Sequence, residues 1–192
     1  MKLNFFAKLF GGNMPKLESK RLKFRAIKRS DIDDIYEYSK NPITSEYLLW
    51  SPHQSIYATQ QVVDIILNKY KSQEYHDWAI VLKEGNKMIG TCGFTNIDDE
   101  NKVIEIGYVL NPDFWGRGLA TEAVETIMEF AFTKMDANRV EAKFIKGNDA
   151  SLAVMKKVGM TFEGYHRDAI ISKGKFKTVG IASILKKEYF NR

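Results

Sequence analysis

The sequence predicts an α/β fold of the α+β type: one domain with a mixed, mostly antiparallel sheet of about seven strands and about four flanking helices. First, the 192 residues are 44% hydrophobic and 28% charged, which is enough for a single domain with a substantial core. Second, alternating apolar segments and segments with helical spacing follow each other in the order β-αα-βββ-α-β-α-ββ. Third, no repeat, low-complexity run or linker divides the chain.

The first half of the chain contains three of the predicted strands and two of the helices. Residues 21–27 alternate and predict a strand, and the helix that follows it ends near residues 41–42. A loop leads to a second helix over about residues 57–71, whose apolar positions fall on one side. Strands over residues 77–83 and 88–97 are then joined by a Glu-Gly-Asn-Lys turn.

The second half begins with a strand over residues 103–110, followed by a glycine-containing turn and a long amphipathic helix. The apolar face of that helix comprises Val124, Ile127, Met128, Ala131 and Met135. A strand over residues 139–145 and a short helix over 150–158 come next. Strands over 162–171 and 176–185 pair as a hairpin and end the domain.

The N-terminal region carries most of the positive charge. The chain has a net charge of +5, and residues 1–29 hold nine lysines and arginines against one glutamate. Such a region is typical of a solvated basic face, or of one that meets an acidic partner such as ribosomal RNA. We expect residues 1–14 to form an N-terminal extension, either amphipathic or disordered, and residues 15–192 to form the domain.

Two bulk features bear on the compartment. No apolar run is long enough to span a membrane, and the apolar stretch at residues 3–10 is too short for a signal peptide. The single cysteine, Cys92, cannot form an internal disulfide, which favours a reducing compartment. The sequence therefore predicts a cytoplasmic protein that does not act at a membrane.

The turn after residue 110 has the composition of an oxyanion cradle. The alternating strand runs through residues 111–114 into Trp115-Gly116-Arg117-Gly118-Leu119-Ala120, and a helix begins at once. Glycines let backbone N–H groups face outward, and the first helical turn adds unpaired N–H groups and a partial positive charge. No lysine follows Gly118, which argues against a Walker loop, and Thr121 replaces the third glycine of a dinucleotide fingerprint.

The turn resembles the acetyl-CoA pyrophosphate loop of GCN5-related N-acetyltransferases, whose pattern is Gln/Arg-x-x-Gly-x-Gly/Ala. Gly118 and Ala120 match its last two positions. Trp115 departs from the first, as in the branch that acetylates N-terminal amines of ribosomal proteins, the RimJ/RimL-like enzymes. Residues 17–25, 148–151 and 157–160 resemble further motifs of that branch in the same order, so the likeness covers roughly residues 15–186.

The resemblance implies acetyl-CoA as co-substrate and a GNAT-like fold in which two central strands splay apart to admit pantetheine. Backbone groups around Val109 and Leu110 would bind the pantetheine amides. Residues 115–121, together with Asn148, would complete the cofactor site. The predicted loop residues are Trp115, Gly116, Arg117, Gly118, Leu119, Ala120 and Thr121. Arg117 would add charge beside the pyrophosphate, or would be an ordinary exposed arginine.

The catalytic residues implied by the resemblance are Glu105 and Ser151. Several family members carry a glutamate near position 105, where it would act as general base; otherwise it would be a glutamate paired across the sheet. The tyrosine that many relatives use as general acid falls at Met155, which cannot donate a proton. Ser151 is the substitute that the ribosomal branch suggests, although Asn148 and Ser151 also fit a helix-capping role.

The acceptor is expected to be a primary amine, most naturally a protein N-terminal α-amine such as that of a ribosomal protein. Trp50 and Tyr165 are candidate acceptor-binding residues, with packing and surface roles as alternatives. A small-molecule amine (a polyamine, an aminoglycoside or an amino acid) and a non-catalytic acyl-CoA-binding module are the rival functions. No residue pattern predicts a metal site, no direct nucleic-acid binding is required, and a monomer or a homodimer is expected.

Overall fold

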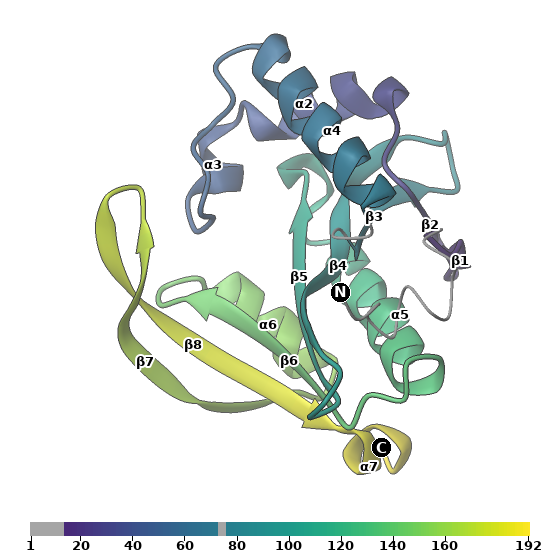
Figure 1. Cartoon of the computed structure of the whole chain (residues 1–192), viewed down its shortest axis with the longest axis vertical. Helices are drawn as coiled ribbons and strands as arrows, with labels where there is room; N and C mark the ends of the chain where they lie inside the picture. The colour runs from purple at the N-terminus through teal and green to yellow at the C-terminus, as the bar shows by residue number, and fades with distance from the viewer. Residues whose placement is uncertain (1–13, 73–75) are drawn as a thin grey trace.

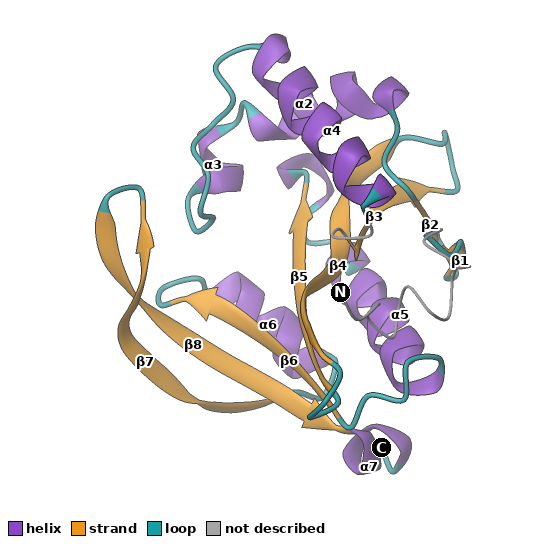
Figure 2. Ribbon diagram, viewed as in Figure 1, coloured by secondary structure: helices purple, strands orange, loops and turns teal. Residues whose placement is uncertain are grey.

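The computed structural model describes residues 14–72 and 76–192, and in this part of the chain an eight-stranded sheet forms the centre (Figures 1 and 2). The strand order is β1-β2-β3-β4-β5-β6-β8-β7. Every neighbouring pair is antiparallel except β5 and β6, which run parallel. The predicted α/β class with a mixed, mostly antiparallel sheet is therefore confirmed.

The strands lie where the alternation of the sequence predicted them, within about two residues at each end. Their bounds are β1 Leu17–Glu18, β2 Leu22–Arg25, β3 His76–Leu82, β4 Met88–Asp98, β5 Val103–Leu110, β6 Arg139–Ile145, β7 Thr161–Ser172 and β8 Lys175–Leu185. The two-residue β1 is the strand that the sequence did not predict. It pairs with β2 through Leu17 opposite Phe24, a contact that a two-residue pattern cannot signal.

The helices include the four that were predicted and two short ones. Their bounds are α2 Ile32–Ser39, α3 Pro42–Ser45, α4 Ile56–Lys71, α5 Leu119–Thr133, α6 Asp149–Lys157 and α7 Lys186–Phe190, with 3-10 turns η1 Arg29–Asp31 and η2 Pro112–Phe114. The unpredicted helix α3 is set by local chemistry, because Pro42 occupies its first turn and the Asn41 side chain accepts the Ile43 N–H at 3.2 Å.

Helices cover both faces of the sheet. On one face α5 and α6 pack over the central strands, and the core there includes Ile106, Ile127 and Val140, all at most 2% exposed. On the other face α2 and α4 pack together over β3 and β4, around Val63, Val81 and other buried residues. The strands are thus held from both sides near β5, which fixes where the following turn and helix α5 begin.

The parallel pair β5 and β6 separates partway along its length. Pairing runs from Val103 opposite Arg139 to Ile106 opposite Ala142 and goes no further, although both strands continue. Figure 1 shows the two strands diverging from their meeting point, with α6 behind β6. The resemblance predicted such a splayed pair, and it leaves the last four residues of β5 without ladder partners in β6.

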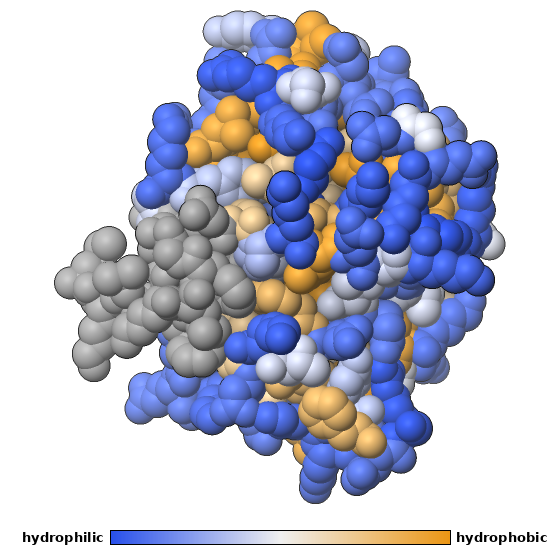
Figure 3. Space-filling view, turned by 90° about the vertical axis from the view of Figure 1, so that its right-hand side faces the viewer, coloured by the Kyte–Doolittle hydropathy of each residue, from blue (hydrophilic) through white to orange (hydrophobic). Residues whose placement is uncertain are grey.

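The surface is mainly polar, as the composition predicts. Figure 3 shows one face on which hydrophilic side chains dominate and hydrophobic ones appear mostly between them. Within the described residues, no helix combines the length and the apolar character needed to cross a membrane. The extension predicted for residues 1–14 lies outside the described residues except for Met14, which packs against the main core.

Candidate active site

A cavity of about 480 Å³ opens where β5 and β6 separate. Its walls come from three parts of the sequence: the end of β5 with the turn and start of α5, one side of α6, and the α3 segment. Tyr108, Val109 and Leu110 line it from β5, and Asn148 and Ser151 line it from α6. The loop and the helix start contain seven predicted cofactor-binding residues, Trp115 to Thr121. All of them except Arg117 line this cavity.

The backbone conformation of two glycines leaves free space beside the turn that leads into α5. Gly116 and Gly118 have φ angles of +73° and +72°, in the left-handed region that glycine adopts without strain. A Cβ built on Gly116 would meet nothing within 4 Å, so this side of the turn is free space. The turn is anchored by Asn111, 2% exposed, whose side chain accepts the Asp113 N–H and donates to Glu37 at 2.8 Å.

The first turn of α5 presents N–H groups to this free space. Gly118 is the N-cap residue and supplies no side-chain cap, while its carbonyl accepts the Glu122 N–H at 3.1 Å. The N–H groups of the three preceding helical residues point out of the helix start without an intrahelical acceptor. Together with the helix dipole they give this end of the cavity a partial positive charge, which suits an anionic ligand.

The side chains of Trp115 and Arg117 fold back onto the turn. The Trp115 indole N–H donates to the Leu110 carbonyl at 2.8 Å, and the residue remains 46% exposed. The Arg117 guanidinium donates to the Asp113 carbonyl at 2.9 Å and lies 5.1 Å from the centre of the Phe114 ring. In this conformation Arg117 is directed at the η2 turn rather than at the glycines.

The backbone of β5 faces the gap at alternate residues. The Asn111 N–H donates to the Ile89 carbonyl at 2.7 Å, so Val109, two residues earlier, likewise bonds towards β4. Tyr108 and Leu110 lie between these positions, so their backbone groups point to the other side, where β6 has separated. The sequence predicted pantetheine contact for Val109 and Leu110. Of these two, the backbone of Leu110 faces the gap, as does that of Tyr108, and the contact itself remains a prediction.

Helix α6 brings Asn148 and Ser151 to the cavity. The Asn148 side chain is the N-cap and accepts the Ser151 backbone N–H at 3.1 Å. This leaves the Ser151 hydroxyl for another partner, and its oxygen lies 2.8 Å from the Tyr108 hydroxyl oxygen. Asn148 therefore supplies the cap, and the catalytic role of the Ser151 hydroxyl remains a prediction. Met155, where many relatives carry a tyrosine, is 1% exposed and belongs to the core.

Tyr108 is a site residue that the motif comparison missed. Its single hydroxyl proton can be donated either to the Ser151 carbonyl, 3.1 Å away, or to the Ser151 hydroxyl oxygen. Burial raises the pKa of its phenol, the hydrogen bond with Ser151 opposes this only in part, and the group stays protonated at neutral pH. The alternation of the strand could have indicated this residue from the sequence. Tyr108 lies on the same strand face as Ile104 and Ile106, which is the face covered by the helices that follow.

Glu105 lies on the opposite face of β5 from Tyr108. Its carboxylate accepts from Lys143 on β6 at 2.5 Å and from the Thr95 hydroxyl at 2.9 Å. The side chain is 18% exposed and is not among the cavity-lining residues. The structure thus contains the cross-sheet ion pair that was one of the two expected roles, at the closed end of the splayed pair. Its catalytic role remains a prediction.

The two acceptor-site candidates lie apart from the cavity lining. Trp50 is half-buried beside His53, with ring centres 5.5 Å apart. Tyr165 is 42% exposed and packs edge-on against Phe162, with Lys146 above its ring. The α3 segment instead supplies Tyr47, which lines the cavity next to Gly147. The position of Tyr47 depends on the path of the loop after α2, which the sequence does not indicate.

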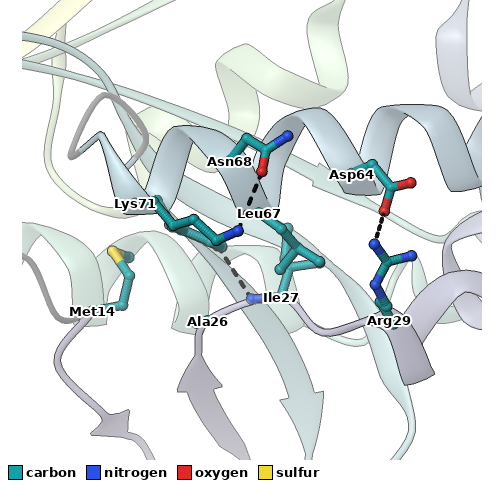
Figure 4. Close-up of a pocket in the computed structure, with 9 residues that line it drawn as sticks. Met14, Ala26, Ile27, Arg29, Asp64, Leu67, Asn68 and Lys71 are labelled. Carbon is teal, nitrogen blue, oxygen red and sulfur yellow. Dashed lines mark hydrogen bonds and ion pairs between the residues drawn. The ribbon is translucent and has the colours of Figure 1, made fainter.

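A second cavity of about 460 Å³ lies between α4 and the segment after β2 (Figure 4). Its charged side chains have partners within the cavity: Arg29 forms an ion pair with Asp64 at 2.7 Å, and the Lys71 ammonium donates to the neutral Asn68 side chain at 3.4 Å. This cavity lacks the glycine turn and the helix start that characterise the first one. Across residues 14–72 and 76–192, no group of three or more His, Cys, Asp or Glu side chains is arranged to hold a metal ion.

Comparison with known proteins identifies the class of protein to which this chain belongs. A model of the GNAT acetyltransferase domain matches residues 21–161. An uncharacterized N-acetyltransferase of Bacillus licheniformis is 33% identical over 92% of this chain and 99% of its own length. The spermidine N(1)-acetyltransferase of Escherichia coli is 20% identical over 92% of this chain and 91% of its own length.

Among solved structures, the ribosomal L7/L12 α-N-protein acetyltransferase RimL, in complex with coenzyme A, aligns with a TM-score of 0.75 at 24% identity. The alignment covers 89% of this chain and 98% of RimL. The fold and the sequence matches therefore define an acetyltransferase enzyme. More particularly, the chain belongs to the GNAT, or GCN5-related, N-acetyltransferase family, which confirms the family and the enzyme class predicted from its motifs.

Proposed function

We propose that this enzyme transfers the acetyl group of acetyl-CoA to the α-amine of a protein N-terminus, such as that of a ribosomal protein, in the cytoplasm. The observation that carries the proposal is the single cavity that joins an anion-binding helix start to the Tyr108–Ser151 hydroxyl pair. The free Cys92 thiol, buried in the core, is compatible with the reducing cytoplasm.

The start of α5 fits the diphosphate of acetyl-CoA. Its outward N–H groups, the dipole of a 15-residue helix and the two left-handed glycines provide donors and room for an anion. Leu110 and Tyr108 direct their backbone groups into the gap where the pantetheine arm would lie. Trp115 already donates to the Leu110 carbonyl, so we assign the Leu110 N–H as the donor from β5. When bound, acetyl-CoA supplies the acetyl thioester.

The reaction is a direct transfer that needs two proton movements. The neutral amine nitrogen forms a bond to the acetyl carbon while the carbon–sulfur bond breaks, so the sulfur leaves as a thiolate. The Ser151 hydroxyl, held by Tyr108, delivers a proton to that sulfur and is reprotonated from solvent. The excess proton on nitrogen leaves through water to Glu105. Holding both partners in line can contribute up to about 7–11 kcal/mol of barrier lowering in reactions of this kind.

The charge pattern on the Glu105 side of the sheet favours an acceptor with one amine. Glu105 and Glu141 both contact Lys143, at 2.5 and 3.8 Å. A polycation such as spermidine is best held by carboxylates that have no basic partner. Here it would have to compete with Lys143 for Glu105 and Glu141. An α-amine also needs less help, since its deprotonation at pH 7 costs about 1.4 kcal/mol against about 4.6 kcal/mol for a lysine amine.

A small-molecule amine is the second candidate acceptor, and the Escherichia coli spermidine acetyltransferase among the relatives is the observation that favours it. The deciding experiment is a thiol-release assay with acetyl-CoA and a panel of N-terminal peptides, polyamines and aminoglycosides. We expect kcat/KM to be highest for a peptide with a free α-amine, and to be lost when that amine is blocked. A preference for spermidine over every peptide would overturn the assignment of the acceptor.

Glu105→Gln is expected to lower turnover by about tenfold at pH 7, and by more at lower pH. The reason is that the neutral fraction of an α-amine of pKa about 8 falls as the pH falls, so dependence on a base grows. The measurement is the pH–rate profile of the variant. Glu141→Gln, which removes a neighbouring carboxylate near the same lysine, is the control and should leave the profile unchanged. Identical profiles for both variants and the parent would remove Glu105 as a base.

A further inference from the structure

A second arginine lies at the glycine turn, contributed by the N-terminal part of the chain. Arg21, in the turn between β1 and β2, donates through Nη1 to the Arg117 carbonyl at 2.9 Å. Its Nη2 lies 3.7 Å from the position that a Cβ on Gly118 would take. The side chain is 45% exposed and borders Gly118, which lines the cavity, although Arg21 is not itself among the lining residues. Nothing in the local sequence of the turn indicates this neighbour.

Arg21 also neutralises a carboxylate that would otherwise oppose an anion. Glu122 lies on the first turn of α5, and it accepts from the Arg21 Nε at 2.6 Å, from the Arg21 backbone N–H at 2.7 Å and from the Ser19 hydroxyl at 2.8 Å. Partial burial raises the pKa of Glu122, but the hydrogen bonds from Arg21 and Ser19 outweigh it, and the net shift is downward. Glu122 is therefore a fixed negative charge, with Arg21 as its counter-ion.

The two arginines of the turn differ in what their guanidinium groups do. Arg117 is directed to the Asp113 carbonyl and the Phe114 ring. Arg21 is fixed by Glu122 and the Arg117 carbonyl, so its orientation costs little entropy when a ligand arrives, and its Nη2 borders Gly118. An arginine held in this way is suited to a charge-assisted contact with phosphate through its remaining nitrogen, Nη2.

We propose that Arg21, rather than Arg117, supplies the side-chain cation that binds the diphosphate of acetyl-CoA, so that the β1–β2 turn completes the co-substrate site. The inference rests on the proposed use of acetyl-CoA at the start of α5. It adds a binding residue about 100 positions away from the loop motif. It also gives the Arg21–Glu122 ion pair a function besides tying the N-terminal strands to α5.

The test compares Arg21→Gln with Arg117→Gln by calorimetric titration of three probes: coenzyme A, 3′-dephospho-coenzyme A and pantetheine. A lost charge-assisted phosphate contact weakens binding by about tenfold or more. We expect Arg21→Gln to weaken both nucleotide probes by this same factor and to leave pantetheine, which has no phosphate, unchanged. Arg117→Gln should change none of the three by more than about twofold. Raised salt should weaken the nucleotide probes less in Arg21→Gln than in the parent.

The variant Glu122→Gln distinguishes direct phosphate binding by Arg21 from a purely structural role of the Arg21–Glu122 ion pair. It also provides a test if Arg21→Gln does not fold. It removes the negative charge and leaves Arg21 in place, so coenzyme A should bind at least as tightly as to the parent protein. Equal weakening in Glu122→Gln and Arg21→Gln would show that Arg21 acts only by holding the helix, and would overturn the proposal. So would a larger loss in Arg117→Gln. If the parent protein binds none of the nucleotide probes, the proposed function itself fails.

Discussion

Gly118→Asp is expected to abolish the stabilisation of this protein by acetyl-CoA. For the parent protein, ligand at about 100 times its Kd adds about 2.7 kcal/mol to the free energy of unfolding. In a chain of this size that corresponds to a rise in Tm of roughly 5–10 °C. The variant places a carboxylate at the N-cap of α5, beside the position assigned to the diphosphate, where like charges repel.

The variant should still fold, which makes the measurement interpretable. Gly118 has a φ angle of +72°, and aspartate tolerates the left-handed region better than most residues. A Cβ at this position meets only the Arg21 Nη2, at 3.7 Å, and aspartate is also a favoured N-cap residue. The left-handed φ still costs aspartate some stability relative to glycine, so we expect the Tm of the ligand-free variant to lie below that of the parent, and the rise with acetyl-CoA is measured from each protein's own Tm.

Gly118→Asn is the matched control for charge. Asparagine has the same shape, the same tolerance of the left-handed region and the same capping ability, but it carries no charge. We expect this variant to keep most of the rise in Tm with acetyl-CoA. If the aspartate and asparagine variants both retained the full rise, the helix start would not be the diphosphate site. If both lost it, steric blockage rather than charge would be the cause.

Ser151→Ala is expected to lower kcat by about 10²-fold while the KM for acetyl-CoA stays within about threefold. This is the lower end of the range for loss of a general acid. The substitution removes the hydroxyl that contacts Tyr108 at 2.8 Å. It leaves the backbone N–H that Asn148 caps, so the start of α6 should persist. Single-turnover and steady-state kinetics with the best acceptor of the panel provide the measurement.

Two further variants separate chemistry from capping. Tyr108→Phe removes the partner of the Ser151 hydroxyl, and we expect a smaller loss in kcat than for Ser151→Ala, since the serine proton is still present. Asn148→Ala removes the cap and should cost about 1 kcal/mol of stability with little change in the chemical step. A Ser151→Ala protein that bound acetyl-CoA poorly but turned over at the parent rate would assign Ser151 to structure alone.

Much of the fold was predictable because its determinants are local. The strand over Val103–Leu110 and the helix start at Leu119 follow from alternation, glycines and helical spacing within a few residues. The same signals could not find the two-residue β1 or the short α3. β1 depends on its partner strand, and α3, although Asn41 and Pro42 initiate it locally, is too short at four residues to show a helical repeat.

The site was predictable in its backbone and less so in its side chains. The glycine turn and α6 were found by motif, and they line one cavity with the end of β5. The side-chain partners were not found, because Tyr108 meets Ser151 across 43 positions and Arg21 meets Glu122 across 101. Pairings of this kind depend on strand order and register, which no local pattern specifies.

The sequence by itself determined the order of elements, the family and the outward-facing amides at the start of α5, because glycine conformation, alternation and helix initiation act within one or two turns of chain. The tertiary structure alone decided which side chains surround those amides. It directed Arg117 away from the glycines, brought Arg21 to them, and put Glu105 and Tyr108 on opposite faces of one strand. The physical reason is that alternation along a strand says only which side chains share a face. What each face meets is decided by the neighbouring strands and helices.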